Sequence, residues 1–136
     1  MNFNRSLIIA VDFDGTIVED LYPKIGKPIR FAFETLKKLQ ENGHRLILWS
    51  YRSGKRLDEA VAFCKKNGIH FYAINKSFPE EQHTNEQSRK IHADIFIDDR
   101  NLGGFIGWSE VYQTLIGTEN NIKREQKKKR FLDFFR

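Results

Sequence analysis

The chain has 136 residues, of which 40% are hydrophobic and 30% charged, and this composition is ordinary for one globular domain. This composition excludes general disorder, and the chain is too short to form two independent hydrophobic cores. The single cysteine, Cys64, excludes an intramolecular disulfide and favours a buried structural thiol in a reducing, cytoplasmic compartment. The first apolar run is too short for a signal peptide or a transmembrane segment, so neither is expected.

The net charge of +5 is concentrated at the C-terminal end, where residues 118–136 carry seven basic and three acidic side chains. Residues 1–117 are nearly neutral, which argues against a nucleic-acid footprint over the whole domain. We therefore expect one domain over 1–117 and a basic amphipathic tail over 118–136. This tail is expected to pack on the domain or on another subunit of a homo-oligomer, or to stay in solvent. Contact with nucleic acid or a membrane surface is the less favoured alternative.

Two strand-and-helix units are expected in the first half of the chain. The continuous apolar run 6–11 is typical of a buried strand in a parallel sheet, and a helical pattern follows from Pro28. The unit repeats with a strand over 45–49 and a helix over 55–66. An Asn-Gly pair follows each helix and predicts a left-handed helix end, at 42–43 and at 67–68.

The second half of the chain continues this alternation. A short strand is expected over 71–74, an irregular segment over 75–93 with a short helix near Asn85, a strand over 94–98 and a helix over 105–116. Strands that alternate with helices predict an α/β fold with a central parallel sheet. Right-handed crossovers would place helices on both faces of this sheet, which gives a three-layer Rossmann-like sandwich.

Polar residues follow three of the four strands, at the point where each strand ends: Asp12 and Asp14, Ser50 and Arg52, and Asp98 and Asp99. One such residue alone is most often a turn or a helix cap. If the first strand lies between the second and the fourth, all three groups meet in one crevice at the carboxyl ends of the strands. Carboxylates that converge in a crevice repel one another unless a cation compensates their charge, and hard oxygen ligands select Mg²⁺. The sequence therefore predicts a Mg²⁺ site.

Three motifs resemble those of the haloacid dehalogenase superfamily of phosphohydrolases. Asp12-Phe-Asp14-Gly-Thr16 is similar to the first motif of that family. The run 46–50, an apolar strand that ends in Ser50, is similar to the second motif, and 95–99 is similar to the fourth motif in its paired-acid form. Together the motifs span residues 7–100, which is nearly the whole predicted domain.

The resemblance implies a role for each motif residue. Asp12 would attack phosphorus and form an aspartyl-phosphate, and Asp14 would protonate the leaving oxygen and then activate water. Mg²⁺ would be held by the Asp12 carboxylate, the backbone carbonyl of Asp14 and Asp99, with Asp98 acting through a water or from outside the ligand set. Ser50 would donate a hydrogen bond to the transferring phosphoryl group.

The lysine of the family's third motif has two candidates. The resemblance favours Lys90, which stands just before the last strand, where small relatives without a cap tend to carry this lysine. Lys76 is the rival candidate, because it directly follows the third strand. Arg52 adjoins the second motif and is a further candidate phosphate or leaving-group contact. The intervals 17–27 and 75–93 are too short for a cap domain, so the resemblance implies a capless member.

The predicted function is therefore a Mg²⁺-dependent phosphatase that hydrolyses phosphomonoesters through an aspartyl-phosphate. Its substrate is expected to be a phosphorylated small molecule or the phosphorylated end of a macromolecule. A phosphomutase or phosphotransferase shares the first chemical step, but nothing here covers the site against water. A non-enzymatic phosphoacceptor or binding module is the third alternative, although its acidic pair normally precedes the acceptor Asp on a separate strand.

Overall fold

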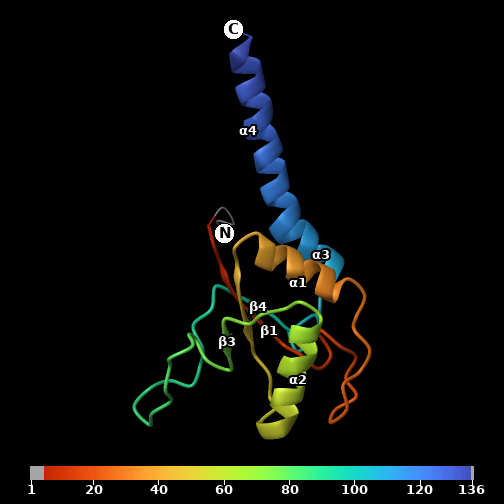
Figure 1. Cartoon of the computed structure of the whole chain (residues 1–136), viewed down its shortest axis with the longest axis vertical. Coiled ribbons are helices and arrows are strands. Elements are labelled where there is room, and N and C mark those ends of the chain that lie inside the picture. Colours follow the sequence, from red (N-terminus) through yellow and green to blue (C-terminus); the bar gives the residue numbers. More distant parts are fainter. Residues whose placement is uncertain (1–4, 136) are drawn as a thin grey trace.

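The computed structural model describes residues 5–135, and for residues 118–125 it describes the backbone alone. In chain order the elements are β1 (Ile8–Val11), α1 (Ala32–Glu41), β2 (Arg45–Leu48), α2 (Gly54–Lys66), β3 (Ala73–Ile74), β4 (Ile95–Ile97), α3 (Trp108–Tyr112), the π-helix η1 (Gln113–Gly117) and α4 (Thr118–Phe134) (Figure 1). The predicted α/β alternation is confirmed.

The four strands form one parallel sheet in the order β3-β2-β1-β4. β1 therefore lies between β2 and β4, which is the arrangement that the predicted crevice requires. Val11, the last residue of β1, is level with Leu48 of β2 and with Ile97 of β4. The residues that follow these three strands consequently leave the sheet at the same edge.

Alternate residues of β1 belong to two separate hydrophobic clusters, one on each face of the sheet. Ile9 and Val11 pack with buried residues from α1, α2, α3 and η1. Ala10 packs with Ile47 of β2, Ala73 of β3 and Ile91, which lies in the segment between β3 and β4. All helical residues of the described core thus fall in the first cluster, and irregular chain packs against the second face.

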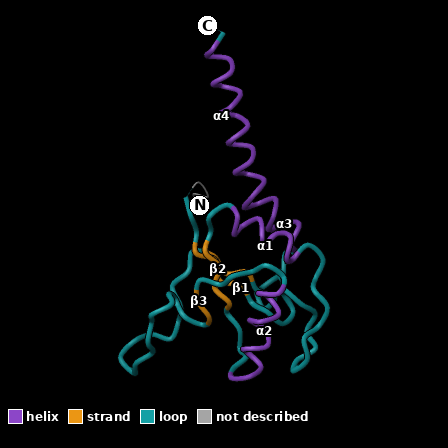
Figure 2. The backbone as a smooth tube through the Cα atoms, in the orientation of Figure 1, coloured by secondary structure: helices purple, strands orange, loops and turns teal. Residues whose placement is uncertain are grey.

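The prediction of helices on both faces is therefore wrong for the described residues. The segment 75–93 is loop throughout (Figure 2), and the short helix expected near Asn85 is a turn closed by a hydrogen bond from Gln87 N to Thr84 O. This segment is too polar to present an apolar stripe at helical spacing, so packing does not stabilise a helix there.

The first helix begins later than Pro28, because Phe31 has a left-handed backbone (φ 69°) and α1 starts only at Ala32. Before that point, Ile29 N donates to Ile17 O at 2.8 Å, which ties the chain to the loop that follows β1. The two predicted left-handed helix ends are confirmed, since φ is 88° at Gly43 and 87° at Gly68.

The predicted helix over 105–116 begins at Trp108 and continues through η1 into α4 without leaving helical geometry at Gly117. α4 extends away from the sheet on its own (Figure 1), and every described side chain from 126 to 135 is exposed. These side chains do not pack on the domain, contrary to one of the expected arrangements. Within the described residues, no helix has the length and apolar character needed to cross a membrane.

Candidate metal and phosphate site

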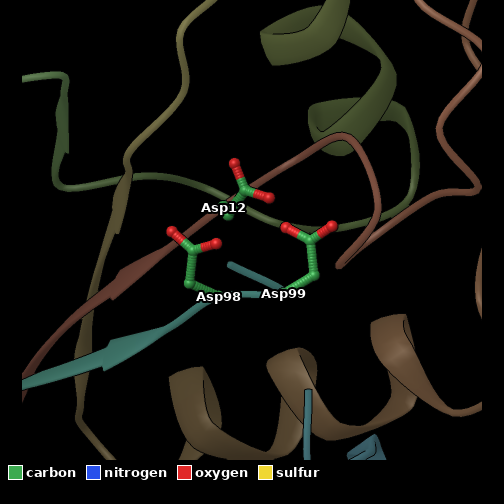
Figure 3. A group of neighbouring side chains, drawn as sticks. All are labelled: Asp12, Asp98 and Asp99. Atoms are coloured by element: carbon green, nitrogen blue, oxygen red, sulfur yellow. The ribbon is translucent and has the colours of Figure 1, made fainter. Parts of the chain in front are cut away.

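Three carboxylates meet at the carboxyl ends of the two central strands. Asp12 directly follows β1, and Asp98 and Asp99 directly follow β4. Each offers an oxygen that lies within 4.8 Å of the others, and Figure 3 shows the three side chains turned toward one another. They line a cavity of about 460 Å³ together with Asp14, Trp49, Ser50, Tyr51 and Arg100. The predicted convergence is therefore present for Asp12, Asp98 and Asp99.

The electrostatics of this group favour a bound cation. Asp12 is only 8% exposed, and its burial, a hydrogen bond with Asp99 and the charge of Asp98 raise its pKa to about 8. Among the described residues, Oδ1 of Asp99 is a buried side-chain oxygen without a hydrogen-bond partner. A hard divalent ion would be a partner for Oδ1 of Asp99 and would offset the negative charge of the three carboxylates. The three acids therefore fit a Mg²⁺ or Ca²⁺ ion.

Two small residues shape the loop that carries Asp12. Gly15 has φ +89°, and a Cβ at this position would overlap Oδ2 of Asp99, so the close approach of the two loops requires glycine. Thr16 Oγ1 donates to Oδ2 of Asp12 at 3.0 Å and fixes the rotation of that carboxylate. The indole Nε1 of the buried Trp108 donates to the carbonyl of Thr16 at 2.7 Å, which anchors the loop to α3.

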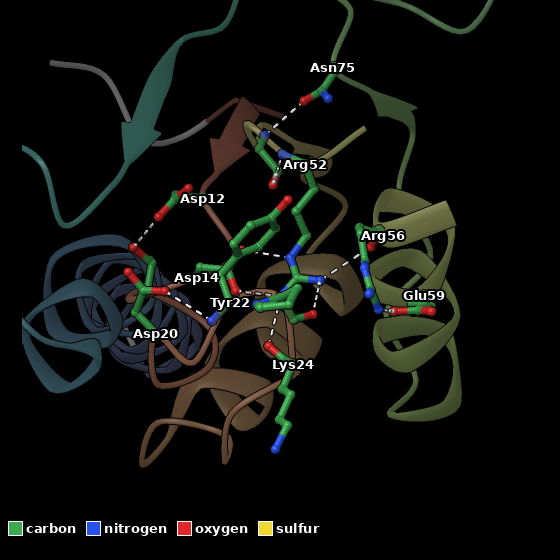
Figure 4. A network of polar contacts seen from close by, with 12 residues as sticks. Asp12, Asp14, Asp20, Tyr22, Lys24, Arg52, Arg56, Glu59 and Asn75 are labelled. Atoms are coloured by element: carbon green, nitrogen blue, oxygen red, sulfur yellow. Dashed lines mark hydrogen bonds and ion pairs between the residues drawn. The ribbon is translucent and has the colours of Figure 1, made fainter. Parts of the chain in front are cut away.

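Asp14 does not belong to the converging group. Its carboxylate turns to Arg52, whose Nε and Nη2 donate to the two carboxylate oxygens at 2.7 Å each (Figure 4). Both side chains are fully buried, so this is a two-armed ion pair shielded from water. The side chain of Asp14 is therefore not a metal ligand in this conformation, and only its backbone carbonyl keeps the ligand role that the resemblance implied.

The prediction that Arg52 contacts phosphate is wrong for this conformation. A guanidinium has five N–H donors. Besides the two bonds to Asp14, Nη2 donates to the carbonyl of Lys24 at 3.0 Å, and Nη1 lies 3.3 Å from the carbonyl of Pro23 and 3.4 Å from that of Arg56. All five donors thus have protein acceptors, and Arg52 joins the loop after β1 to α2.

Ser50 lines the cavity, as its motif predicts, and a residue that the sequence did not single out holds it there. Asn75 has a left-handed backbone (φ 54°), and its Oδ1 accepts a hydrogen bond from Ser50 N at 2.7 Å. The Ser50 hydroxyl oxygen accepts the N–H of Arg52 at 3.1 Å, which leaves the hydroxyl proton to be donated elsewhere. The only sequence signal for Asn75 is its position directly after the third strand.

Neither candidate lysine is among the residues that line the cavity. Lys76 is half-buried and follows Asn75 at the carboxyl edge of the sheet. Lys90 is exposed in the loop before β4, and its backbone N–H donates to Ser88 Oγ at 3.1 Å. The structure therefore does not bring either ammonium group into contact with the acidic group.

Comparisons with known proteins identify a relative of the chain but no activity. No family model matches the chain, and no curated protein matches it. A solved structure, that of a conserved protein coded by a locus from Bacteroides thetaiotaomicron, is 54% identical and superposes with a TM-score of 0.78. The match covers 84% of this chain and 93% of the Bacteroides chain. At this identity and coverage, the chain belongs to the same family as that conserved Bacteroides protein.

Proposed function

We propose that the protein is a Mg²⁺-dependent phosphohydrolase of the haloacid dehalogenase type, with Asp12 as its nucleophile. The observation that carries this proposal is the meeting of Asp12, Asp98 and Asp99, with oxygens within 4.8 Å of one another, in a cavity that also contains Ser50. A nucleophile, a cation site and a hydroxyl donor in one cavity are the parts that phosphoryl transfer requires.

The acids would hold the ion, with the backbone carbonyl of Asp14 as a further ligand. When bound, Mg²⁺ supplies positive charge that offsets the carboxylates and the phosphate oxygens. The buried Oδ1 of Asp99, without a partner among the described residues, supports this assignment because a buried carboxylate oxygen is seldom left unsatisfied.

The chemistry assigned to the chain has two displacements. An oxygen of Asp12 attacks phosphorus, the ester P–O bond breaks, and the leaving oxygen takes a proton from Asp14. Water then attacks the phosphorus of the aspartyl-phosphate and gives a proton to Asp14, and the bond to Asp12 breaks to release inorganic phosphate. In this conformation both oxygens of Asp14 accept hydrogen bonds from Arg52, so each proton transfer requires the Asp14 carboxylate to turn from Arg52 toward the cavity.

Ser50 and Lys76 are the residues assigned to the phosphoryl group. The Ser50 hydroxyl retains a proton for donation to a phosphoryl oxygen. Lys76 is the better candidate for the third-motif lysine, because the residue before it, Asn75, binds the backbone of Ser50. Lys90 has no such link to the site. Substitution of each lysine by alanine tests this choice: K76A should lower kcat/KM strongly and K90A should leave it near the unsubstituted value.

The loops beside the cavity support a capless enzyme. The loop after β1 closes on itself, because Glu19 N donates to Lys27 O at 2.8 Å and Ile29 N donates to Ile17 O. The segment 75–93 is loop, and neither segment contains a domain. A site without a lid admits water to the aspartyl-phosphate, which favours hydrolysis over transfer to a second substrate.

The direct test is Mg²⁺-dependent release of phosphate from an aryl phosphate by the purified protein. Activity should disappear in EDTA and in D12N, and the exposed-acid variant D58N serves as the matched control that retains it. Unchanged turnover in D12N would reject Asp12 as the nucleophile. A long-lived aspartyl-phosphate without turnover would instead favour the phosphoacceptor alternative.

A further inference from the structure

The cavity contains two aromatic residues beside its acidic group. Tyr51 directly follows Ser50 and is 62% exposed, and Trp49 directly precedes Ser50 and is half-buried. Both line the same cavity as Asp12. A single exposed aromatic ring on a protein surface needs no explanation, but a ring at the mouth of a candidate active site offers a flat apolar face to whatever enters.

Tyr51 is braced by a neighbouring ring. Its ring centroid lies 5.1 Å from that of Tyr22, at an interplanar angle of 59°. Tyr22 in turn contacts Arg52, whose guanidinium lies over the Tyr22 ring, 5.1 Å from its centroid (Figure 4). The bonds from Arg52 to the carbonyls of Pro23 and Lys24 fix the loop that carries Tyr22. The buried ion pair therefore holds this aromatic wall in place before any ligand binds.

We propose that Tyr51 is a specificity-determining residue that stacks on a flat aromatic group of the substrate, so that the site takes phosphomonoesters carrying a nucleobase or an aryl ring. This inference rests on the proposed phosphohydrolase function. A stacked ring tolerates any π-face, and in a site without a lid it supplies the contact area that a cap domain would otherwise provide. A bare sugar phosphate has no flat face to offer to Tyr51.

The experiment compares substrates that differ only in the ring. A nucleoside 5′-monophosphate is paired with ribose 5-phosphate, and 3-phenylpropyl phosphate is paired with propyl phosphate, so that the leaving oxygen is an alkyl oxygen in every case. The aromatic member should have the higher kcat/KM, by about tenfold and mainly through KM, as expected for one base stacked on one ring. A preference within the nucleoside pair identifies the ring as a nucleobase, and a preference within the phenylpropyl pair identifies it as an aryl group.

Variants then connect the preference to the residue. Y51F should retain the ratio of the two kcat/KM values, and Y51A should reduce this ratio toward one. F131A removes a ring of matching exposure, 63%, from α4 and should leave the ratio unchanged. Equal kcat/KM within both pairs, or a preference that survives in Y51A, overturns the inference.

Failure of the wider proposal is distinguishable from failure of this one. If the folded protein hydrolyses neither these four compounds nor the aryl phosphate, the phosphohydrolase proposal fails, and calorimetric titration in Mg²⁺ decides the stacking proposal. Tighter binding of a nucleoside 5′-monophosphate than of ribose 5-phosphate, lost in Y51A, supports the role of Tyr51. Equal or absent binding of the two compounds overturns it.

Discussion

Asp14 and Arg52 form a fully buried ion pair in which both carboxylate oxygens accept a guanidinium N–H at 2.7 Å. The two residues are 38 positions apart and come from the loops after β1 and β2. The pair therefore connects the loop that carries Asp12 to the loop that carries Ser50, and it fixes the distance between the two sides of the cavity.

R52M should destabilise the protein by roughly 3–5 kcal/mol, because it leaves the buried charge of Asp14 without a partner. It also removes the donors for the carbonyls of Pro23 and Lys24. Urea unfolding followed by circular dichroism measures the change. R56A breaks only an exposed pair with Glu59 and should change stability by less than about 1 kcal/mol. Equal effects of the two substitutions would contradict the structural role of Arg52.

G15A should weaken Mg²⁺ binding about tenfold or more, because the new Cβ would overlap the Asp99 carboxylate and displace it. G43A is a matched control, since Gly43 has nearly the same φ, +88°, and no atom within 4 Å of an added Cβ. Both substitutions carry the same backbone strain of about 1–2 kcal/mol. Titration calorimetry of Mg²⁺ binding to both variants separates the effect of backbone strain from the effect of the overlap with Asp99. Equal Mg²⁺ affinities would show that Gly15 is needed only for its backbone conformation.

The metal-free protein should lose stability as the pH rises from about 4 to about 8. The pKa of Asp12 is raised from 3.8 to about 8 in the folded state, so the folded state binds a proton that the unfolded state has released over this range. The free energy of unfolding in EDTA, measured at several pH values, should therefore fall across this window. D12N should flatten the dependence, and saturating Mg²⁺ should remove it. A free energy of unfolding that rises over the same window would contradict the assignment.

Cys64 should resist alkylation in the folded protein. Its side chain is fully buried, and burial raises the pKa of its thiol to about 12, so the reactive thiolate is scarce at neutral pH. Iodoacetamide labelling read by mass spectrometry should be absent at neutral pH and complete in denaturant. Rapid labelling without denaturant would show that the core around α2 opens.

Removal of the chain from residue 126 onward should change the free energy of unfolding by less than about 0.5 kcal/mol, because the described side chains of this segment are exposed. Thermal unfolding of the shortened and full-length chains checks this. If the tail instead contacts another subunit, light scattering will give a lower molar mass for the shortened chain than for the full-length chain. The Tm of the full-length chain will then rise with protein concentration, and that of the shortened chain will not.

The sheet could be predicted from the sequence because its strands are continuous apolar runs that end at charged or polar residues. Asp12 and Asp98 follow such runs directly, so the topology alone brings them to one edge. The face opposite the helices could not be predicted, since the packing of Ala10 against Ile91 depends on a loop without periodicity. The delayed start of α1 depends on one left-handed residue, Phe31, a conformation that its residue type does not favour.

The site residues divide in the same way. The positions of Asp12, Asp98 and Asp99 were predicted because each lies next to the end of a strand, and the backbone there fixes where the side chain lies. The pairing of Asp14 with Arg52 was not predicted, because sequence adjacency does not give the direction of these side chains. The carbonyl acceptors of Arg52 come from a loop almost thirty residues earlier, at Pro23 and Lys24. Asn75 and the ring pair of Tyr22 and Tyr51 likewise depend on contacts between distant segments, which a single sequence does not reveal.

The hydrogen bond from Trp108 to Thr16 gives the protein a built-in optical reporter. The indole is 2% exposed, and its nitrogen bonds to the loop that carries Asp12, so any shift of that loop changes the surroundings of the fluorophore. The chain has two tryptophans, and the other, Trp49, faces the cavity itself. With Trp49 replaced by phenylalanine, the emission of Trp108 would record the movement of this loop in real time, without a dye and without a chosen substrate.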